Sequence, residues 1–421
     1  KEYRRQRQMC IRDRDMVGEG FLNTLKKSMQ EGKVTMAQIN KACERILIAK
    51  YQLGLFDDPY KYCNEQRSAT EVFTAANRAE ARKIASQSFV LLKNNNQLLP
   101  LSASKKIALV GPLANAKENM TGTWSVGADN TQSVTLLKGL TDAIGTNGKV
   151  LYAKGSNLED DEEMQKRQTL FGKDIPRDGR TAEQMIQEAI SISADADVIV
   201  AALGEGAEST GESASKSEID IPYAQKRLLK ALLATGKPVV LVLFNGRPMT
   251  LTWESENVPA ILDVWFAGSE AGDAIADALL GKVNPSGKLS MSFPRNVGQI
   301  PLYYNHKNTG RPFTAKWFAK FQSNYIDVPN DPLYPFGYGL SYTQFEYGAM
   351  QLSAKQLKGN QTLRVTVPVK NAGKYAGKEV VQLYIRDEVG TITRPVQELK
   401  GFNKIELAPG ETKNISFDIT P

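Results

Sequence analysis

The chain has 421 residues, 41% of them hydrophobic, which is enough for two or three packed domains of roughly 100–200 residues each. Its net charge is +7, but the basic residues are spread along the chain and are not interleaved with aromatic residues, which argues against a nucleic-acid-binding surface. No run of about 18 apolar residues occurs, so we expect no membrane span.

The residue types that most often bind metals are scarce. The spacings of the three cysteines, Cys10, Cys43 and Cys63, fit no zinc site, and their odd number argues against a full disulfide framework. His306 is the only histidine, which excludes paired-histidine metal sites and argues against a Ser–His–Asp triad. We therefore expect no metal and no cofactor, and any chemistry must depend on carboxylates.

The first part of the chain is predicted to be helical. Apolar residues at helical spacing predict a helix that ends at Gly32, and the capping-box pattern of Thr35 and Gln38 begins a second helix that runs to about Leu53. A third helix is predicted over residues 70–91. These helices have apolar faces but no strands of their own to cover, so they are interpreted as the end of a larger helical or α/β unit followed by a linker.

Residues 105–295 alternate between predicted strands and predicted helices. The strands are expected at residues 107–110, 149–152, 197–203, 238–244 and 260–266. The helices are expected at residues 136–144, 182–192, 224–235 and 270–280. Residues 156–180 are charged and are expected to be an irregular insertion. Strands that alternate with helices of this length predict a mainly parallel sheet.

Residues from Phe345 onward are predicted to be all-β. Apolar and polar residues alternate over residues 363–370, a second strand is expected at 380–385, and two more flank the turn at Pro409 and Gly410. Turns at this spacing are typical of a β-sandwich. Only four or five strands are predicted where a sandwich needs about seven, so the chain is expected to end within this domain.

The loop at residues 204–222 is the most informative stretch. It follows a strand that is apolar on consecutive residues, as in the middle of a parallel sheet, and ligands of such sheets bind beyond the strands' carboxyl ends. The loop carries the glutamates Glu205, Glu208, Glu212 and Glu218. On spacing alone, a site and an ordinary solvated loop explain it equally well. Its Gly–Glu–Gly start also resembles a dinucleotide loop, but no helix follows at once.

Short motifs in a fixed order resemble glycoside hydrolase family 3, specifically its three-domain β-glucosidase-like members. They are KYQLGLFDDPY (50–60), LLKN (91–94), LPL (99–101), IALVGPLA (107–114), GRP (246–248), NPSGKL (284–289) and YPFGYGLSY (334–342). The resemblance implies a (β/α)8-like barrel, then an α/β sandwich domain, then a fibronectin type III-like domain. The last motif is expected to dock the β-sandwich onto the α/β domain.

The resemblance assigns most of this chain to the C-terminal portion of such a protein, which lacks most of the catalytic barrel. It implies an unmatched terminus at 1–14, the last barrel helices at 15–60, a linker at 61–100, the α/β sandwich at 101–310, connecting loops at 311–344 and a truncated fibronectin type III-like domain at 345–421.

The family's chemistry indicates which residues to examine. Its members are retaining enzymes, which place two carboxyl groups about 5–5.5 Å apart, one as nucleophile and one as acid/base. The resemblance implies that the nucleophile, an aspartate on a barrel strand, precedes residue 15 of this numbering and is absent. It implies that the acid/base is Glu212, with Glu208 as the alternative and Glu205 third. The alternative for Glu212 is a solvent-facing carboxylate that has nothing across from it in this chain.

Other candidates near this loop each have two interpretations. Trp124 would either lie against a sugar ring or be a half-buried packing residue. Glu205 would either touch substrate or, as we favour, hydrogen-bond neighbouring backbone. Arg247 is expected to pair with a loop carboxylate.

The implied function is hydrolysis of terminal non-reducing β-linked glycosyl residues from a small-molecule β-glucoside or oligosaccharide, in the periplasm or outside the cell. This chain alone is expected to be nearly inactive. The alternative is a non-catalytic carbohydrate-binding or scaffold module.

Overall fold

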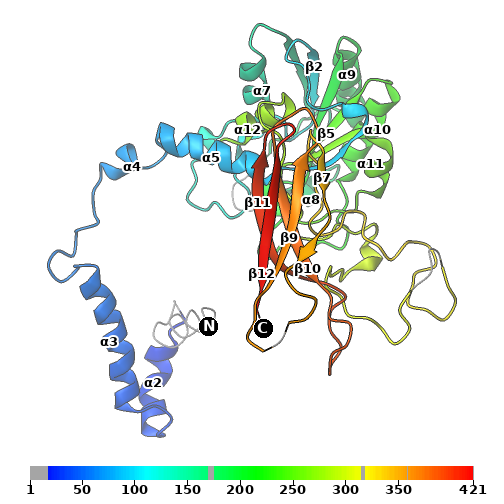
Figure 1. Ribbon diagram of the computed structural model, residues 1–421. Helices are drawn as coiled ribbons and strands as arrows, with labels where there is room; N and C mark the ends of the chain where they lie inside the picture. The colour runs from blue at the N-terminus through cyan, green and yellow to red at the C-terminus, as the bar shows by residue number, and fades with distance from the viewer. Residues whose placement is uncertain (1–17, 169–174, 314–317, 358, 421) are drawn as a thin grey trace. The chain divides into compact units, whose positions relative to one another are not determined.

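The computed structural model describes residues 18–168, 175–313, 318–357 and 359–420, so the unmatched terminus at 1–14 lies outside the described residues (Figure 1). The chain divides into two compact units, Lys1–Thr74 and Ala75–Pro421. Within the described residues, no helix combines the length and the apolar composition needed to cross a membrane.

The first unit contains the helices α2 (Gly20–Gln30), α3 (Met36–Gln52) and α4 (Arg67–Thr70). The predicted capping box at the start of α3 is confirmed: the Thr35 hydroxyl accepts the backbone N–H of Gln38 at 3.3 Å, and Gln38 Oε1 accepts the Thr35 N–H at 2.9 Å. No described residue of this unit is buried, and large apolar side chains such as Leu22 stand exposed on its helices.

The second unit begins with helix α5 (Ala75–Ser88), which leads into a six-stranded sheet in the order β1-β6-β5-β4-β2-β3. Its strands are β1 (Val90–Asn94), β2 (Lys106–Val110), β3 (Lys149–Ala153), β4 (Val198–Gly204), β5 (Val239–Phe244) and β6 (Ala260–Asp263). All pairings are parallel except that of β1 with β6. The predicted mainly parallel sheet is therefore confirmed.

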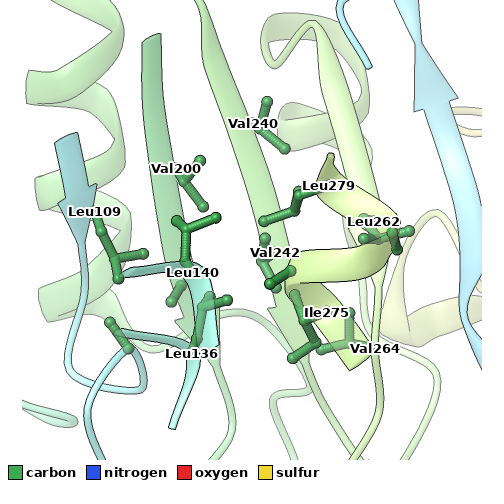
Figure 2. Packing of buried hydrophobic residues seen from close by; sticks show 14 of the residues in the cluster. Leu109, Leu136, Leu140, Val200, Val240, Val242, Leu262, Val264, Ile275 and Leu279 are labelled. Atoms are coloured by element: carbon green, nitrogen blue, oxygen red, sulfur yellow. The ribbon is translucent and has the colours of Figure 1, made fainter. Parts of the chain in front are cut away.

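Helices cover both faces of the sheet, which explains why β4 is buried along its whole length. On one face, α7 (Leu136–Ile144) and α12 (Ala271–Leu279) place Leu140 and Ile275 against strand residues such as Val200 and Val242 (Figure 2). On the other face, α9 (Ala182–Ala194) and α10 (Tyr223–Ala234) pack against a separate apolar cluster, and the short helix α11 (Thr252–Asn257) precedes β6.

Three sequence predictions in this unit were wrong in part. The helix predicted over 70–91 is α5, and residues 90–94 form the antiparallel strand β1. The strand predicted over 260–266 ends at Asp263, because Trp265 has a positive φ of 53° that no strand adopts. The insertion at 156–180 contains the helix α8 (Glu162–Arg167), and its first residues are buried. Further short helices of the unit include α6 (Lys117–Met120) and the 3-10 turn η4 (Ala207–Ser209).

A β-sandwich follows. Its strands are β7 (Phe345–Tyr347), β8 (Gln351–Leu352), β9 (Leu363–Asn371), β10 (Gly377–Ile385), β11 (Glu398–Leu407) and β12 (Thr412–Ile419). One sheet holds β12, β9, β7 and β8, and the other holds β10 and β11. The four long strands match the prediction. The described residues from 345 onward contain six strands rather than the four or five predicted, and β7 and β8 are too short to show an alternation in the sequence.

The glycine- and aromatic-rich segment at 334–342 joins the β-sandwich to the α/β sheet, as predicted. The Leu340 N–H donates to the Leu91 carbonyl in β1 at 2.8 Å, and the Tyr338 hydroxyl donates to the Leu92 carbonyl at 3.1 Å. Gln382 of β10 donates to the Gly337 carbonyl at 3.0 Å. The β-sandwich is thus bonded to the edge of the α/β sheet through this segment.

Candidate functional site

The loop at residues 204–222 leaves the carboxyl end of β4, as the sequence predicts. Gly204 has a φ of +136°, and a Cβ there would lie 1.9 Å from the Phe244 carbonyl oxygen of β5. Only glycine permits this close backbone approach. The next residue is tied to the same strand, because the Glu205 N–H donates to the Phe244 carbonyl at 2.8 Å. The root of the loop is therefore fixed to the sheet.

Glu205 forms a buried ionic centre under the loop. Its side chain is fully buried, with Oε1 3.2 Å from Arg247 Nε and 3.6 Å from Lys216 Nζ. Burial raises the pKa of Glu205, while the positive charges of Arg247 and Lys216 oppose that rise. The predicted pairing of Arg247 with a loop carboxylate is confirmed.

Arg247 also binds the backbone of the loop at two places. Its Nη2 donates to the Ala214 carbonyl at 2.9 Å and to the Ser209 carbonyl. These carbonyls lie on either side of Glu212. The root and both arms of the loop are thus joined through a single guanidinium group.

The two acid/base candidates occupy different positions on the loop. Glu208 lies in η4 and is half-buried, whereas Glu212 is exposed between two residues with positive φ, Gly211 at +98° and Ser213 at +59°. Within the part of the chain that the structure describes, the Glu212 side chain makes no hydrogen bond or ion pair. The solvent-facing interpretation therefore describes its present environment.

The turn that carries Trp124 contacts the loop through the side chain of Thr123. A Cβ on Gly211 would lie 2.3 Å from Thr123 Cγ2, so the turn that carries Trp124 lies against the residue before Glu212. Trp124 is 75% exposed, so among the described residues of this chain it is not a half-buried packing residue. The turn that carries an exposed indole thus lies against the loop that carries an exposed carboxylate, and an aromatic face can pack against a sugar ring.

A cavity of about 840 Å³ lies along the loop. Both Glu208 and Glu212 line it, together with Glu159, Gln168 and Tyr223. Both candidates therefore lie at one hollow beyond the sheet, and their catalytic roles stay predictions.

Glu159 was missed by the sequence reasoning. It is buried, which raises the pKa of its carboxyl group, and its Oε1 accepts the Gln168 Nε2–H at 2.9 Å. Gln168 in turn accepts a hydrogen bond from the Ser209 hydroxyl in the loop. The available signal was its position just beyond β3, at the same edge of the sheet, but the surrounding charged residues suggested an exposed insertion.

The chain matches the Glycosyl hydrolase family 3 C-terminal domain over residues 89–342 and the Fibronectin type III-like domain over residues 379–421. It belongs to glycosyl hydrolase family 3. The resemblance inferred from the motifs is confirmed, as are the predicted α/β fold and the fibronectin type III-like β-sandwich. The finer domain limits stay predictions.

Two curated relatives illustrate the membership. The periplasmic beta-glucosidase of Salmonella typhimurium is 45% identical over 410 residues, which are 97% of this chain and 54% of that protein. A beta-xylosidase of Formosa agariphila is 38% identical, over 94% of this chain and 52% of that protein. The chain thus spans about half the length of the curated relatives it matches.

A solved structure agrees with this family membership. The beta-glucosidase of Listeria innocua in complex with isofagomine superimposes with a TM-score of 0.86 at 39% identity, covering 97% of this chain and 54% of that protein. A mutant of that Listeria enzyme was crystallised with laminaribiose. The relatives and the solved structure thus carry the names of glycosidases.

Proposed function

We propose that the protein containing this chain hydrolyses terminal non-reducing β-linked glycosyl residues with retention, and that Glu212 is its acid/base residue. The observation that supports this most directly is the loop beyond β4, which places the exposed Glu212 in the lining of a cavity and packs at Gly211 against the turn that carries the exposed Trp124. The relatives named beta-glucosidase and beta-xylosidase supply the reaction class.

In this mechanism Glu212 acts twice. As a carboxylic acid it gives its proton to the departing glycosidic oxygen, and as a carboxylate it then removes a proton from the water that releases the sugar. A second carboxylate about 5–5.5 Å away must attack the anomeric carbon. We propose that polypeptide upstream of residue 15 supplies it. Trp124 would stack on the apolar face of the sugar, and Glu205 would act from below the loop rather than on substrate.

The test uses a chimera in which the part of the Salmonella relative that this chain does not match is fused to this chain. The chimera should hydrolyse a chromogenic β-glucoside, and the chain alone should be at least about a thousandfold slower, because one member of a cooperating pair is missing. Equal rates for the two proteins would overturn the proposed division of the pair.

Glu212 is tested by E212Q in the chimera, with E208Q as the matched variant. E212Q should lower the turnover of phenyl β-glucoside by roughly 100- to 10,000-fold. Azide should restore turnover of an activated dinitrophenyl β-glucoside by forming the glycosyl azide, because azide attacks the sugar without needing a base. If instead E208Q has the large, azide-rescued loss, the acid/base is Glu208. If neither loses activity while the chain alone binds sugar by calorimetry, the carbohydrate-binding alternative holds.

We further propose a β-glucoside or β-linked oligosaccharide as substrate, with a β-xyloside as the competing class to assay. A periplasmic or secreted location is proposed from the name of the Salmonella relative.

A further inference from the structure

We propose that Arg247, anchored by the buried Glu205, is the positioning residue that holds Glu212 at the cavity. This inference rests on the proposed acid/base role of Glu212. It adds a function for two residues that would touch neither the sugar nor the reacting atoms.

The contacts of Arg247 enclose the segment that carries Glu212. Nη2 donates to the carbonyls of Ser209 and Ala214, and Glu212 lies between those two residues in the sequence. Among the described residues, the backbone of 211–214 makes no hydrogen bond other than the one from Arg247 to Ala214. Removing this guanidinium group therefore leaves the segment without a backbone tether.

The anchor below Arg247 is rigid. Nε of Arg247 donates to Glu205 Oε2 at 3.3 Å, and Glu205 follows directly on β4, where its own N–H is bonded to β5. Glu205 is fully buried, so water does not compete for its carboxylate. A site built on a rigid strand end holds its geometry better than a site on a free loop.

Only arginine can make this set of contacts. One planar group must donate to a carboxylate on one side and to two carbonyls on the other, which the fork of guanidinium N–H groups permits and a lysine ammonium does not. The neighbouring cation Lys216 lies 3.6 Å from the same Glu205 oxygen and is part of the charge balance. Its ammonium makes no hydrogen bond to the loop carbonyls within the described chain.

The tether also explains how the loop keeps an unfavourable backbone. Ser213, directly after Glu212, has a φ of +59°, which is uncommon for a residue with a side chain. Such a conformation persists only when its surroundings fix it. Releasing the Ala214 carbonyl should let Ser213 leave this region, and the Glu212 carboxyl group would then lose its direction.

The first measurement uses this chain as it is. Hydrogen–deuterium exchange is compared for wild type, R247M, R247K and E205Q, with R295M as the control because Arg295 also donates to a backbone carbonyl, that of Asp331 at 3.1 Å, away from the loop. We expect exchange at Ala207 and Ser209, whose backbone N–H groups donate hydrogen bonds within the loop region, to rise at least about tenfold in R247M and less in E205Q, with β4 and β5 unchanged. Unchanged exchange in the loop would overturn the proposal. So would unfolding of both Arg247 variants, which would show that Arg247 holds the whole domain.

The second measurement uses the chimera and separates positioning from general damage. Protonation of the leaving oxygen matters for phenyl β-glucoside and little for dinitrophenyl β-glucoside, whose leaving group departs as an anion. R247M should therefore lower kcat/KM for the phenyl substrate by roughly 100-fold and for the dinitrophenyl substrate by less than about threefold. Azide should not restore R247M, because its Glu212 is still present. Equal losses of kcat/KM on both substrates would overturn the proposal that Arg247 positions the acid/base residue.

The two proposals fail in different ways. If E212Q keeps full activity, the proposed acid/base role fails, whatever the exchange data show for Arg247. If E212Q is inactive and rescued by azide while R247M keeps wild-type kcat/KM on phenyl β-glucoside, only the positioning role fails.

Discussion

Substituting Gly211 by alanine should strain the loop that carries Glu212, and the size of the effect follows from the structure. The new Cβ would lie 2.3 Å from Thr123 Cγ2, more than 1 Å closer than an ordinary contact, at a residue whose φ is +98°. The backbone conformation should cost about 1–2 kcal/mol for a residue with a side chain. The steric overlap should add about 1–3 kcal/mol.

These two contributions can be separated by shrinking Thr123. T123S removes Cγ2 and keeps the hydroxyl group, which lies at an ordinary 3.5 Å from the added Cβ. In the T123S background, G211A should therefore cost only the conformational part, and the double-mutant cycle should show a coupling of about 1–3 kcal/mol.

The assay is urea unfolding of the second unit followed by circular dichroism. The matched control is G127A, because a Cβ at Gly127 would meet nothing within 4 Å. It should change the free energy of unfolding by less than about 0.5 kcal/mol. If G211A costs the same in the threonine and serine backgrounds, the Gly211–Thr123 contact does not hold the Trp124 turn against the loop, and the reasoning about the site fails with it.

Three further predictions concern charge and packing in the second unit. R82M should lower the free energy of unfolding in urea by about 1–3 kcal/mol, because Asp277 on α12 loses two hydrogen bonds of 2.6 and 2.7 Å. The control K83M should lower it by less than about 0.5 kcal/mol, because Glu80, the partner of Lys83, is exposed. Burial raises the pKa of Glu254, so the stability that its protonated form contributes is fully present below the unfolded pKa and is lost as the pH rises through the folded pKa. In a pH series of thermal melts, E254Q should therefore abolish this loss of stability. An unchanged dependence of the melting temperature on pH would contradict the prediction. L140A should cost about 2–5 kcal/mol in the same urea assay, because Leu140 is fully buried between α7 and the sheet, and a cost below 1 kcal/mol would contradict the packing in Figure 2.

Local sequence patterns were enough to predict the elements whose burial follows a single regular pattern along their length. β4 is apolar at consecutive residues because both of its faces are covered. α7 has its predicted limits, and in the structure Thr135 caps its start and Gly145 ends it. β1 was not predictable in this way. Its few apolar residues continue the rhythm of α5, and what makes it a strand is pairing with β6, which is distant in the sequence.

In the site, too, the features set by local sequence and sheet topology were predictable, and those set by contacts between distant residues were not. The position of the acidic loop beyond β4 was predictable, because the topology of parallel sheets determines where ligands bind. The burial of Glu205 was not, since glutamate is almost never fully buried without a partner, and its partner Arg247 is 42 residues away. The contact of Thr123 with Gly211 likewise joins two loops whose sequences show no relation to each other.

The anchoring of the loop that carries Glu212 and of the turn that carries Trp124 to one sheet bears on the proposed catalytic partner. The loop is tied through Arg247 and Glu205 to the ends of β4 and β5, while the Trp124 turn is tied to the segment after β6, where the Gly268 N–H donates to the Met120 carbonyl at 2.9 Å. Contacts within this chain therefore order the backbone of both the loop and the turn. In the retaining mechanism proposed above, the nucleophile lies about 5–5.5 Å from the acid/base, so the polypeptide that carries it would approach an edge that this chain already orders.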